Sequence, residues 1–520
     1  MRRRSANTLA CCCLFIATGH GAVLEPPQIL IRPLMSTHWS QWAPYNQMCP
    51  LVTNGLTGYG GRSPTGCVPV AIGQIMRYYG WPQAGAGVSA YSDTNGICQG
   101  DFTVAWTNAI PWAFLKDYYD PWYDDCPDLV LPLADLMLKL GVAGETDFEP
   151  NGGSADIMVA ARALVQHLDY VMGDLIKAND PLFAQTIEQE LNAHRPVLLN
   201  LNIVPPHTVV ADGLAQDGLV KYVHLNYGWG GQNDGWYAGY DSGSTQSFTA
   251  ILSTLRPKPD VLITCAPNFF ELTTTNGIVP DLNLEVIGVG NKSNSYSMTA
   301  SASWVSVTPS TGVTGTNPLP HRIHLEPASF PSGTNNAVIT IAGDTTNRWR
   351  QVLIRVYKPE PPIIIQQPAD IITLFPTGQV LTISAQAGKV YAPYISNDTL
   401  RYQWLYHGQP MDAATNSWCY TTDYGSYQCQ VTSLGGTIPS REAVVGKVSA
   451  GSRIKIIQFS PSQIILEVGN VQSGQFVLQT GFDLKNWTDL NTVKVTLGGT
   501  VQLKINIPAG DTQRFFQMRE

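Results

Sequence analysis

The sequence is poor in charged residues and lacks the signatures of several common chemistries. Asp, Glu, Lys and Arg make up 13% of its 520 residues, against about 25% in globular proteins. No segment after residue 24 has the roughly 20 apolar residues that span a bilayer. No CxxC…CxxC spacing indicates a zinc site, and no G-x-S-x-G elbow indicates a serine hydrolase. We therefore expect no membrane span, no metal and no cofactor.

Positive charge is also scarce. The chain has 31 basic and 39 acidic residues, a formal net charge of -8. Removal of Arg2, Arg3 and Arg4 with a leader segment would bring the charge to about -11, because the acidic residues all lie later in the chain. Nucleic acids and anionic membranes attract basic surfaces. We therefore expect neither as a partner.

The first residues have the pattern of an export signal. Arg2–Arg4 precede an apolar stretch, Leu9–Ala17, and small residues follow from Gly19 to Ala22. Such an order of basic, apolar and small residues is typical of a signal peptide. We predict a signal peptide over residues 1–24 and a secreted or extracellular mature chain. The alternative, a short buried helix, would carry the unusual run Cys11–Cys13 on its surface.

A change of pattern near Pro257 divides the rest of the chain. Residues 25–257 mix helical and strand periodicity, whereas only short alternating strand patterns follow. The expected fold class is therefore multidomain: an α+β domain followed by two or three all-β sandwich modules. The modules are predicted at 260–358, 363–448 and 453–520. The predicted helices run roughly over Val68–Tyr79, Pro132–Lys139, Ala155–Leu168 and Pro181–Ala193.

The module at 363–448 has an immunoglobulin-like pattern. Trp404 lies in a strand, and Tyr427 comes two residues before Cys429, as in a tyrosine corner. The usual partner cysteine on an early strand is missing, because Leu381–Ser384 occupies that place. Cys419 is a candidate partner for Cys429, a pairing that the sequence does not decide.

Cys67 is the candidate nucleophile. Seven cysteines remain after the predicted signal peptide, and an odd number in an exported chain leaves one thiol unpaired. Cys67 follows Gly66 and begins an apolar helical pattern, with Pro69 in the first turn. A helix N-terminus favours a thiolate and is expected to lower the thiol pKa. A cysteine in such a place is, by itself, more often a small buried residue.

His207 is the candidate general base. It begins an apolar strand pattern that is followed by a second one, Lys221–Tyr227. A hairpin turning at Gln216-Asp217 places His207 opposite Asn226 on one face of the sheet. A turn at Asp217-Gly218 shifts the pairing by two residues and keeps both side chains on that face. An imidazole beside a side-chain amide is oriented to take a proton from a thiol. The pair therefore predicts the base and its orienting residue.

Other histidines are weaker candidates. His224 shares the face of Asn226 and is the rival base, although a structural, hydrogen-bonded role suits it better. His38, His167 and His194 have no carboxylate or amide partner at a fixed spacing. An amide donor for a developing oxyanion is also needed, and Gln41, upstream of Cys67, supplies that residue type.

Taken together, these residues resemble the streptopain family of papain-like cysteine proteases over roughly residues 33–257. Several motifs occur in the family's order, which is more specific than any one of them. They are Gln41-x-x-Pro44-Tyr45-Asn46, Thr65-Gly66-Cys67-Val68, Gln74-Ile75-Met76, Trp81-Pro82, Trp106-x-Asn108-x-x-Pro111, Gly152-Gly153-Ser154-Ala155, Arg195-Pro196-Val197-Leu198, His207 to Gly213 and His224 to Gly231.

The resemblance implies roles for individual residues. Cys67 would be the nucleophile, His207 the base, Gln41 the oxyanion donor and Asn226 the residue that orients His207. A second group would bind substrate or shield the pair from water: Gly153, Ser154, Tyr227 and Trp229. Tyr227 stands where the family usually has Trp, Pro205-Pro206 where it tends to have glycines, and few residues separate Leu24 from Gln41 where it has a propeptide.

The resemblance implies a secreted bacterial cysteine endopeptidase acting on proteins or peptides. The alternative is a catalytically inactive protease-like domain that serves adhesion, with cell-surface or glycan docking through the β modules. The presence of all four catalytic residue types favours the enzyme.

Overall fold

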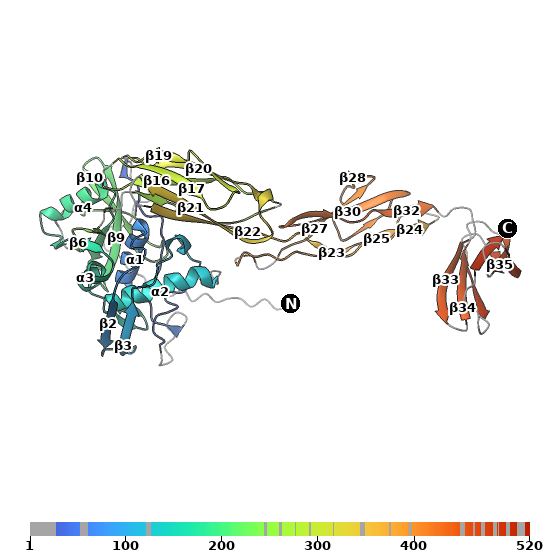
Figure 1. Cartoon of the computed structure of the whole chain (residues 1–520), viewed down its shortest axis with the longest axis horizontal. Coiled ribbons are helices and arrows are strands. Elements are labelled where there is room, and N and C mark those ends of the chain that lie inside the picture. Colours follow the sequence, from blue (N-terminus) through green and yellow to red (C-terminus); the bar gives the residue numbers. More distant parts are fainter. Residues whose placement is uncertain are drawn as a thin grey trace. The chain divides into compact units, whose positions relative to one another are not determined.

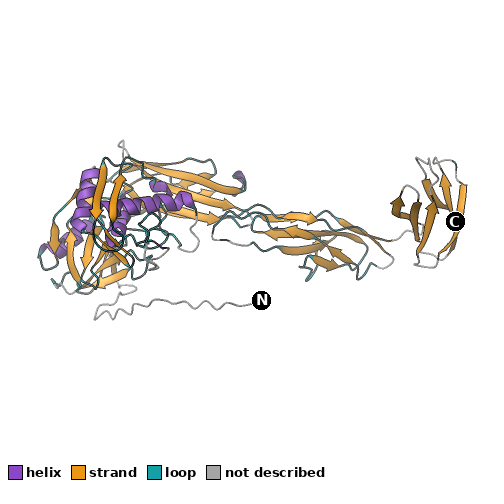
Figure 2. Cartoon of the chain, turned by 90° about the horizontal axis from the view of Figure 1, so that it is seen from below, coloured by secondary structure: helices purple, strands orange, loops and turns teal. Residues whose placement is uncertain are grey.

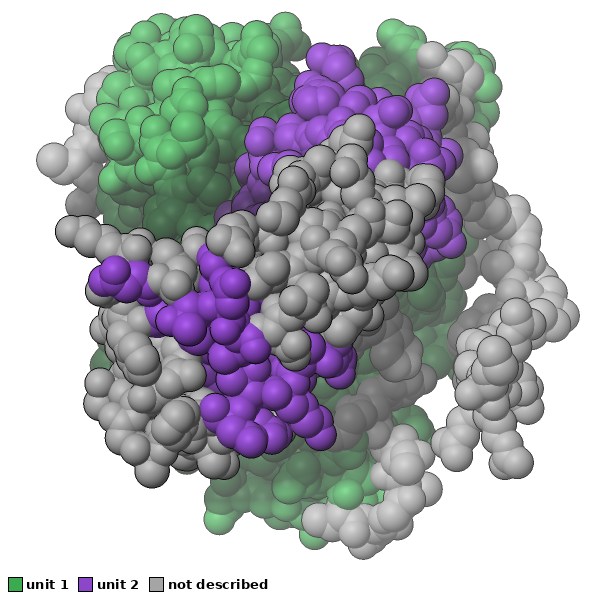
Figure 3. All heavy atoms as spheres, turned by 90° about the vertical axis from the view of Figure 1, so that its right-hand side faces the viewer, with its two compact units in different colours: residues 1–358, 391–396 green, residues 359–390, 397–520 purple. Residues whose placement is uncertain are grey.

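The computed structural model describes residues 28–519, apart from 53–60, 121–125, 244–246, 259, 261–262, 276, 291–292, 316, 344–348, 374–375, 394, 396–397, 448–452, 461–462, 470–473, 482–485, 487, 496–499 and 507–514. The predicted signal peptide, residues 1–24, lies outside the described residues. The chain, drawn in Figure 1, divides into two compact units, which Figure 3 shows in different colours. The first holds residues up to 358 with 391–396, and the second holds 359–390 with the rest.

The first unit contains a seven-stranded antiparallel sheet beside four helices. Its strand order is β11-β10-β9-β8-β12-β7, and β1 also pairs with β9. The central strand β9 is buried over most of its length. These strands are β1 (Gln28–Ile31), β7 (Leu175–Lys177), β8 (Val197–Leu201), β9 (His207–Asp217), β10 (Val220–Asn226), β11 (Gly235–Ala238) and β12 (Phe248–Leu252).

All four predicted helices are present, and they lie in this part of the chain (Figure 2). They are α1 (Cys67–Tyr79), α2 (Pro127–Ala143), α3 (Ile157–His167) and α4 (Leu182–Asn192). Helix α2 begins at Pro127, earlier than predicted, and contains Pro132. An interior proline removes one backbone hydrogen bond, and the buried apolar face of α2 compensates for that loss. Asp156 begins α3, because its side chain accepts from the N–H groups of Met158 and Val159.

Helix α1 is the most buried of the helices. Every residue from Val68 to Tyr79 is buried, and the helix packs against α2 and β9. Full burial of a large apolar side chain contributes roughly 1.5–3 kcal/mol, so the helix is fixed firmly in the core. The helix therefore holds its first residue, Cys67, in a fixed position.

Short pairs of strands complete this part of the unit. The hairpin β4–β5 packs next to the start of α1, with Gly153 beside Gly66. The other pairs are β2–β3 and β6–β13. The bounds are β2 (Val88–Asp93), β3 (Gly100–Ala105), β4 (Asp147–Glu149), β5 (Gly152–Ser154), β6 (Tyr170–Met172) and β13 (Leu255–Pro257), with a 3-10 turn, η2, at Trp112–Phe114.

Residues 263–358 form a β-sandwich of two sheets around their own apolar core. One sheet is β14 (Ile263–Ala266), β16 (Leu282–Gly288), β20 (Leu319–Leu325) and β18 (Val305–Thr308). The other is β15 (Phe269–Thr273), β22 (Trp349–Lys358), β21 (Gly333–Gly343), β17 (Ser295–Ala300) and β19 (Thr311–Val313), and a 3-10 turn, η3, lies at Pro327–Ser329.

This sandwich belongs to the same compact unit as the helices. Phe269, Val289 and Leu353 of the sandwich are part of the buried cluster that surrounds α1. Arg350 Nη2 donates to the carbonyl oxygen of Arg77, near the end of α1, at 3.0 Å. Residues before and after Pro257 thus pack together in one unit, although the sequence pattern changes there. The predicted domain limits stay predictions.

The second unit is entirely β in its described residues. Trp404 and Cys429 pair across β27 and β30 and are both fully buried, and the Tyr427 hydroxyl donates to the carbonyl of Asp423 at 2.9 Å, as in a tyrosine corner. Cys419 and Cys429 are free thiols in the same core. The multidomain fold class, α+β followed by sandwich modules, is confirmed.

The strands of this unit complete the description. In residues 363–447 they are β23 (Ile363–Gln366), β24 (Ile371–Thr373), β25 (Val380–Thr382), β26 (Ser384–Gln386), β27 (Arg401–Tyr406), β28 (Gln409–Pro410), β29 (Trp418–Tyr420), β30 (Gly425–Ser433), β31 (Gly436–Pro439) and β32 (Ala443–Lys447). Two three-stranded sheets follow, with β33 (Arg453–Ser460), β34 (Gln463–Gly469) and β37 (Thr500–Asn506) in one and β35 (Gly474–Gly481), β36 (Thr488–Val495) and β38 (Phe515–Arg519) in the other.

Candidate active site

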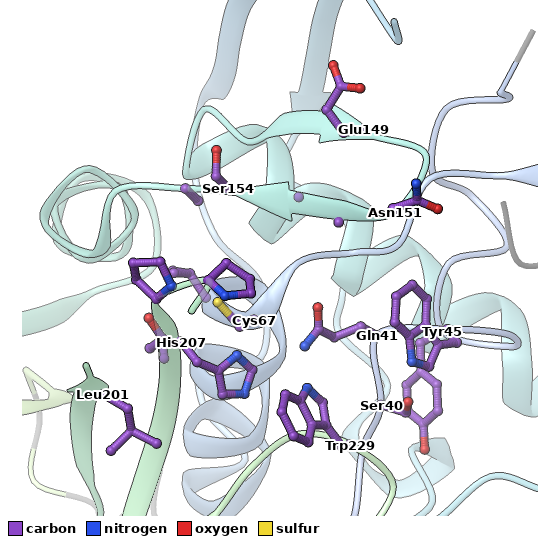
Figure 4. Close-up of a pocket in the computed structure, with 18 of the residues that line it drawn as sticks. Ser40, Gln41, Tyr45, Cys67, Glu149, Asn151, Ser154, Leu201, His207 and Trp229 are labelled. Carbon is purple, nitrogen blue, oxygen red and sulfur yellow. The ribbon is translucent and has the colours of Figure 1, made fainter. Parts of the chain in front are cut away.

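One pocket of the first unit brings together most of the predicted site residues (Figure 4). It has a volume of about 1090 Å³ and is open to solvent on one side. The start of α1, the start of β9, the hairpin β4–β5 and the loop after β10 each contribute to its wall. The predicted residues that line it are Gln41, Cys67, Gly153, Ser154, His207 and Trp229.

The Cys67 thiol is presented by the first turn of α1. Gly66 precedes it with a φ of 87°, in the left-handed region that favours glycine. A Cβ atom at Gly66 would also lie 3.0 Å from the carbonyl oxygen of Gly153. The close approach of these two glycines brings the hairpin β4–β5 against the nucleophile.

The environment of Cys67 keeps its thiol protonated. Burial raises the pKa of the Cys67 thiol, while hydrogen bonds from Thr208 and from the backbone of Cys67 and Val68 act in the opposite direction. The expectation that the helix N-terminus lowers this pKa is therefore wrong for the net effect, because burial outweighs the backbone groups. A base is needed to form the thiolate.

His207, the first residue of β9, is placed to be that base. Its side chain is buried, and Nε2 lies 2.8 Å from the carbonyl oxygen of Tyr227. Because a carbonyl only accepts, Nε2 carries the proton and Nδ1 has the free lone pair. Burial lowers the pKa of His207, so the imidazole is neutral and able to accept a proton. Figure 4 draws this ring next to Cys67.

Two aromatic rings enclose the imidazole. The ring centroids of Trp229 and Tyr227 lie 4.6 Å and 5.8 Å from that of His207. Trp229 is on the pocket wall, whereas Tyr227 is 9% exposed and lies behind His207, outside the pocket lining. Tyr227 therefore does not contribute a substrate-facing surface here, and its part is to pack against His207 and to supply the carbonyl oxygen.

The predicted hairpin register is wrong. The turn lies at Gly218-Leu219, between paired Asp217 and Val220, because Gly218 adopts a φ of 56°. A bulge after His224 then brings Asn226 opposite Val210 and not opposite His207.

Asn226 acts on the surrounding backbone. Its Nδ2 donates to the carbonyl of Thr37 at 2.6 Å, and its Oδ1 accepts from Gln74 Nε2 at 2.9 Å and from the N–H of Gly228 at 3.1 Å. Within the described residues, the hydrogen bond that orients His207 comes from the Tyr227 carbonyl. Asn226 fixes the chain on either side of that carbonyl.

Gln41 lies in the pocket wall beside Cys67 and Trp229 (Figure 4). Its side chain is 7% exposed, and its backbone carbonyl accepts from the N–H of Thr65, close to the nucleophile, at 3.0 Å. The Gln41 side chain thus lines the same pocket as the first turn of α1.

Three residues that support the pocket were not assigned a role from the sequence: Gln74, Thr208 and Asp234. Gln74 is fully buried and joins α1 to Asn226, and its polar side chain in an apolar helix was an available signal. Thr208 is hydrogen-bonded to Cys67 and to Asn200 Oδ1, and Asp234 bonds both Tyr227 and His38. Neither had a signal in the sequence, because its partners are far along the chain.

His224 has a structural role. Its Nδ1 lies 2.6 Å from Asp212 Oδ1, and the other oxygen of Asp212 accepts from the N–H of Met35. The interpretation of His224 as a hydrogen-bonded strand residue is in agreement with these contacts.

In the part of the chain that the structure describes, no three or more His, Cys, Asp or Glu side chains are grouped so that they could hold a metal ion. None of the helices in the described ranges has the length and apolar character needed to cross a bilayer.

A partly buried thiol at the start of a core helix and an imidazole at the start of a central antiparallel strand line one pocket, as in proteases of the papain-like class. Residues 39–237 match the model of the Peptidase C10 family. This part of the chain is thus similar to the Peptidase C10 family, and streptopain is one of the relatives that it resembles.

Two named proteases are similar to this chain. The chain is 27% identical to streptopain of Streptococcus pyogenes serotype M1 over 240 residues, which cover 42% of this chain and 58% of streptopain. It is 27% identical over 220 residues to the thiol protease/hemagglutinin PrtT of Porphyromonas gingivalis, covering 41% of this chain and 24% of PrtT. The chain thus spans less than two thirds of each relative.

Among solved structures, the active wild-type interpain A cysteine protease of Prevotella intermedia matches with 24% identity and a TM-score of 0.36. The match covers 44% of this chain and 98% of interpain A.

Proposed function

We propose that the chain is a secreted bacterial cysteine endopeptidase that hydrolyses peptide bonds with Cys67 as nucleophile and His207 as general base. One observation carries the proposal: the Cys67 thiol and the His207 imidazole line the same pocket, and the imidazole is held so that Nδ1 keeps its lone pair. The pattern of residues 1–24 supports export.

The reaction begins with a proton transfer. His207 Nδ1 takes the proton of the Cys67 thiol, and the sulfur attacks the carbonyl carbon of the scissile peptide. The carbonyl oxygen becomes an oxyanion, which the Gln41 amide and the backbone N–H of Cys67 stabilise. The imidazolium then gives its proton to the leaving amine as the carbon–nitrogen bond breaks.

The second half of the reaction releases the acyl group. Water enters, His207 takes one of its protons, and the resulting hydroxide attacks the thioester carbon. A second oxyanion forms in the same place, and its collapse releases a carboxylic acid and the Cys67 sulfur, which recovers the proton from His207. Trp229 covers the imidazole and keeps bulk water from it.

The test uses the purified chain under reducing conditions with casein as substrate. A thiol-specific irreversible protease inhibitor should modify Cys67 and abolish cleavage. Cys67→Ser and His207→Ala should each lose at least about 10³-fold in kcat/KM. Cys126→Ser is the matched control, because Cys126 is another partly buried thiol of the first unit and does not line the pocket.

The alternative, an inactive protease-like domain that serves adhesion, predicts the opposite result. The reduced wild-type chain would then cleave no unfolded protein, and the inhibitor would not distinguish Cys67 from Cys126. The exposed aromatic pair of Trp418 and Tyr420, with ring centroids 5.2 Å apart, is the feature of the β modules that favours a docking role.

A further inference from the structure

The loop 227–234, between β10 and β11, carries two groups that contact the base. These are the carbonyl of Tyr227, which accepts from His207, and the ring of Trp229, which packs on it. The loop contains three glycines with positive φ, at 228, 230 and 231. These positions have no side chains that could hold the loop by packing, so its shape depends on hydrogen bonds.

The carboxylate of Asp234 closes this loop. Its Oδ1 accepts from the N–H of Tyr227 at 2.8 Å, so one side chain joins the last residue of the loop to the first. Its Oδ2 lies 2.9 Å from Nδ1 of His38. The Asp234 side chain is 8% exposed and that of His38 is 50% exposed. A charge-assisted hydrogen bond of this kind is shorter and stronger than a neutral one.

Tyr227 is therefore held from both sides of its backbone. Asp234 binds its N–H, and the imidazole of His207 donates to its carbonyl. A second tie runs from the N–H of Gly230 to the carbonyl of Trp39, next to His38, at 3.0 Å. The segment before Gln41 and the loop that orients the base are thereby joined at two points.

We propose that Asp234 and His38 are positioning residues for His207: together they fix the Tyr227 carbonyl that sets the tautomer and the angle of the imidazole. The inference rests on the proposed function of the pocket. It assigns to a carboxylate and a half-exposed histidine the orienting effect that sequence reasoning gave to Asn226.

The arrangement also makes the base sensitive to the charge of His38. The hydrogen bond to Asp234 raises the pKa of His38, burial opposes it, and the negative charges of Asp234, Asp212 and Asp117 add to the increase. Those three carboxylates are the charged groups that face His38. The cation is present below this raised pKa and is lost as the pH rises through it. The loop is thus held most firmly on the acidic side of that pKa.

The experiment compares full-length variants in the cleavage of fluorescein-labelled casein and in the alkylation of Cys67 by iodoacetamide. Asp234→Asn and His38→Gln are expected to lower kcat by roughly tenfold with little change in KM, because a misplaced base slows the chemical step. His38→Gln should also remove the decline in wild-type kcat that accompanies the loss of the His38 charge.

His324→Gln is the matched control. His324 forms a similar pair with Asp281, at 2.7 Å, in the β-sandwich away from the pocket. It should leave both kcat and its pH profile unchanged. Thermal melting of each variant separates an effect on positioning from an effect on folding, and His38→Gln changes a half-exposed side chain that should not affect folding.

Two different results would contradict this reasoning. If the wild-type chain cleaves casein and both variants keep its kcat and pH profile, the positioning role is wrong and the proposed function stands. If the wild-type chain cleaves nothing, the proposed function is wrong, and this inference, which rests on it, is wrong as well.

Discussion

The two reacting side chains are both neutral in the resting site. Burial raises the pKa of Cys67 and lowers the pKa of His207, so the environment disfavours the thiolate–imidazolium pair. In the proposed mechanism, the proton therefore moves from Cys67 to His207 as the sulfur attacks the substrate. The proposed mechanism therefore also needs the oxyanion donors assigned to it, Gln41 and the backbone N–H of Cys67.

The lowered pKa of His207 determines the acidic limit of activity. The imidazole accepts a proton only when it is neutral, that is, above its pKa. Because that pKa lies below the ordinary value for histidine, about 6.5, we expect kcat/KM to persist to lower pH than an unperturbed histidine allows. A pH profile of casein cleavage checks this. If kcat/KM falls on the acidic side with an apparent pKa at or above the ordinary value for histidine, the conclusion that the His207 imidazole is buried and neutral is wrong.

The Thr208 hydroxyl should lower the pKa of the Cys67 thiol. Thr208 is buried, and its hydroxyl, which donates to Asn200 Oδ1 at 2.8 Å, can turn to donate to the Cys67 thiolate instead. Thr208→Val keeps the volume and removes the hydroxyl, so the pKa of Cys67 should rise further. An increase of one pKa unit corresponds to about 1.4 kcal/mol and would slow alkylation by iodoacetamide near neutral pH about tenfold. Thr208→Ser should retain the wild-type rate.

The sequence identified Cys67, His207 and Gln41 correctly as residues of one pocket, because the helix start, the strand start and the ordered motifs are local signals. It did not identify Asp234 or His38, whose contact joins residues that are distant along the chain. It also gave Asn226 the wrong strand partner, because the register depends on which residue begins the turn, and Gly218 determined that.

At the scale of elements, the helix α1 and the hairpin β4–β5 fix the nucleophile between them. Hydrophobic periodicity predicted α1 over Val68–Tyr79, within one residue of its observed start. It missed the first turn of α2, which begins at Pro127 and not at Pro132, because a proline also suits the start of a helix. Apolar patterns thus located the helices better than they located their ends.

The contact between α1 and the hairpin can be tested at Gly66. Gly66→Ala should lower kcat/KM by more than about tenfold, because the new Cβ meets the carbonyl of Gly153 and a left-handed alanine is strained. Gly61→Ala is the matched control, since Gly61 also has a positive φ and open space around it. Equal kcat/KM in the two variants would show that the close approach is unimportant for catalysis.

At the scale of the whole molecule, the β-sandwich of residues 263–358 is part of the protease unit. Arg350 is buried at the C-terminal end of α1, where its Nη2 donates to the carbonyl of Arg77 and to Asn268 Oδ1 at 2.7 Å. A cation at this end of a helix is favourable to the helix dipole. The alternative function gives the β modules a docking role, whereas the contacts of this sandwich show that it packs against α1.

Removal of the Arg350 side-chain charge should destabilise the first unit. Arg350→Met is expected to lower its free energy of unfolding by about 2–4 kcal/mol, since the Arg77 carbonyl and Asn268 lose a buried charged donor. Urea unfolding followed by tryptophan fluorescence measures the change. Arg322→Met, which removes an exposed arginine paired with Asp281 in the same sandwich, should change it by less than about 1 kcal/mol. Equal midpoints would contradict the prediction.

The turn at Gly80 shows how closely the two parts of the first unit fit. A Cβ atom there would overlap the guanidinium of Arg350, so the end of α1 has no room for any other residue while Arg350 occupies it. A gene fragment cut at Pro257 would leave this recess empty and expose the apolar partners of Phe269 and Leu353 to water. Trimming after Lys358 would leave them covered, and we expect this to be the shortest piece of the chain that can be purified in active form.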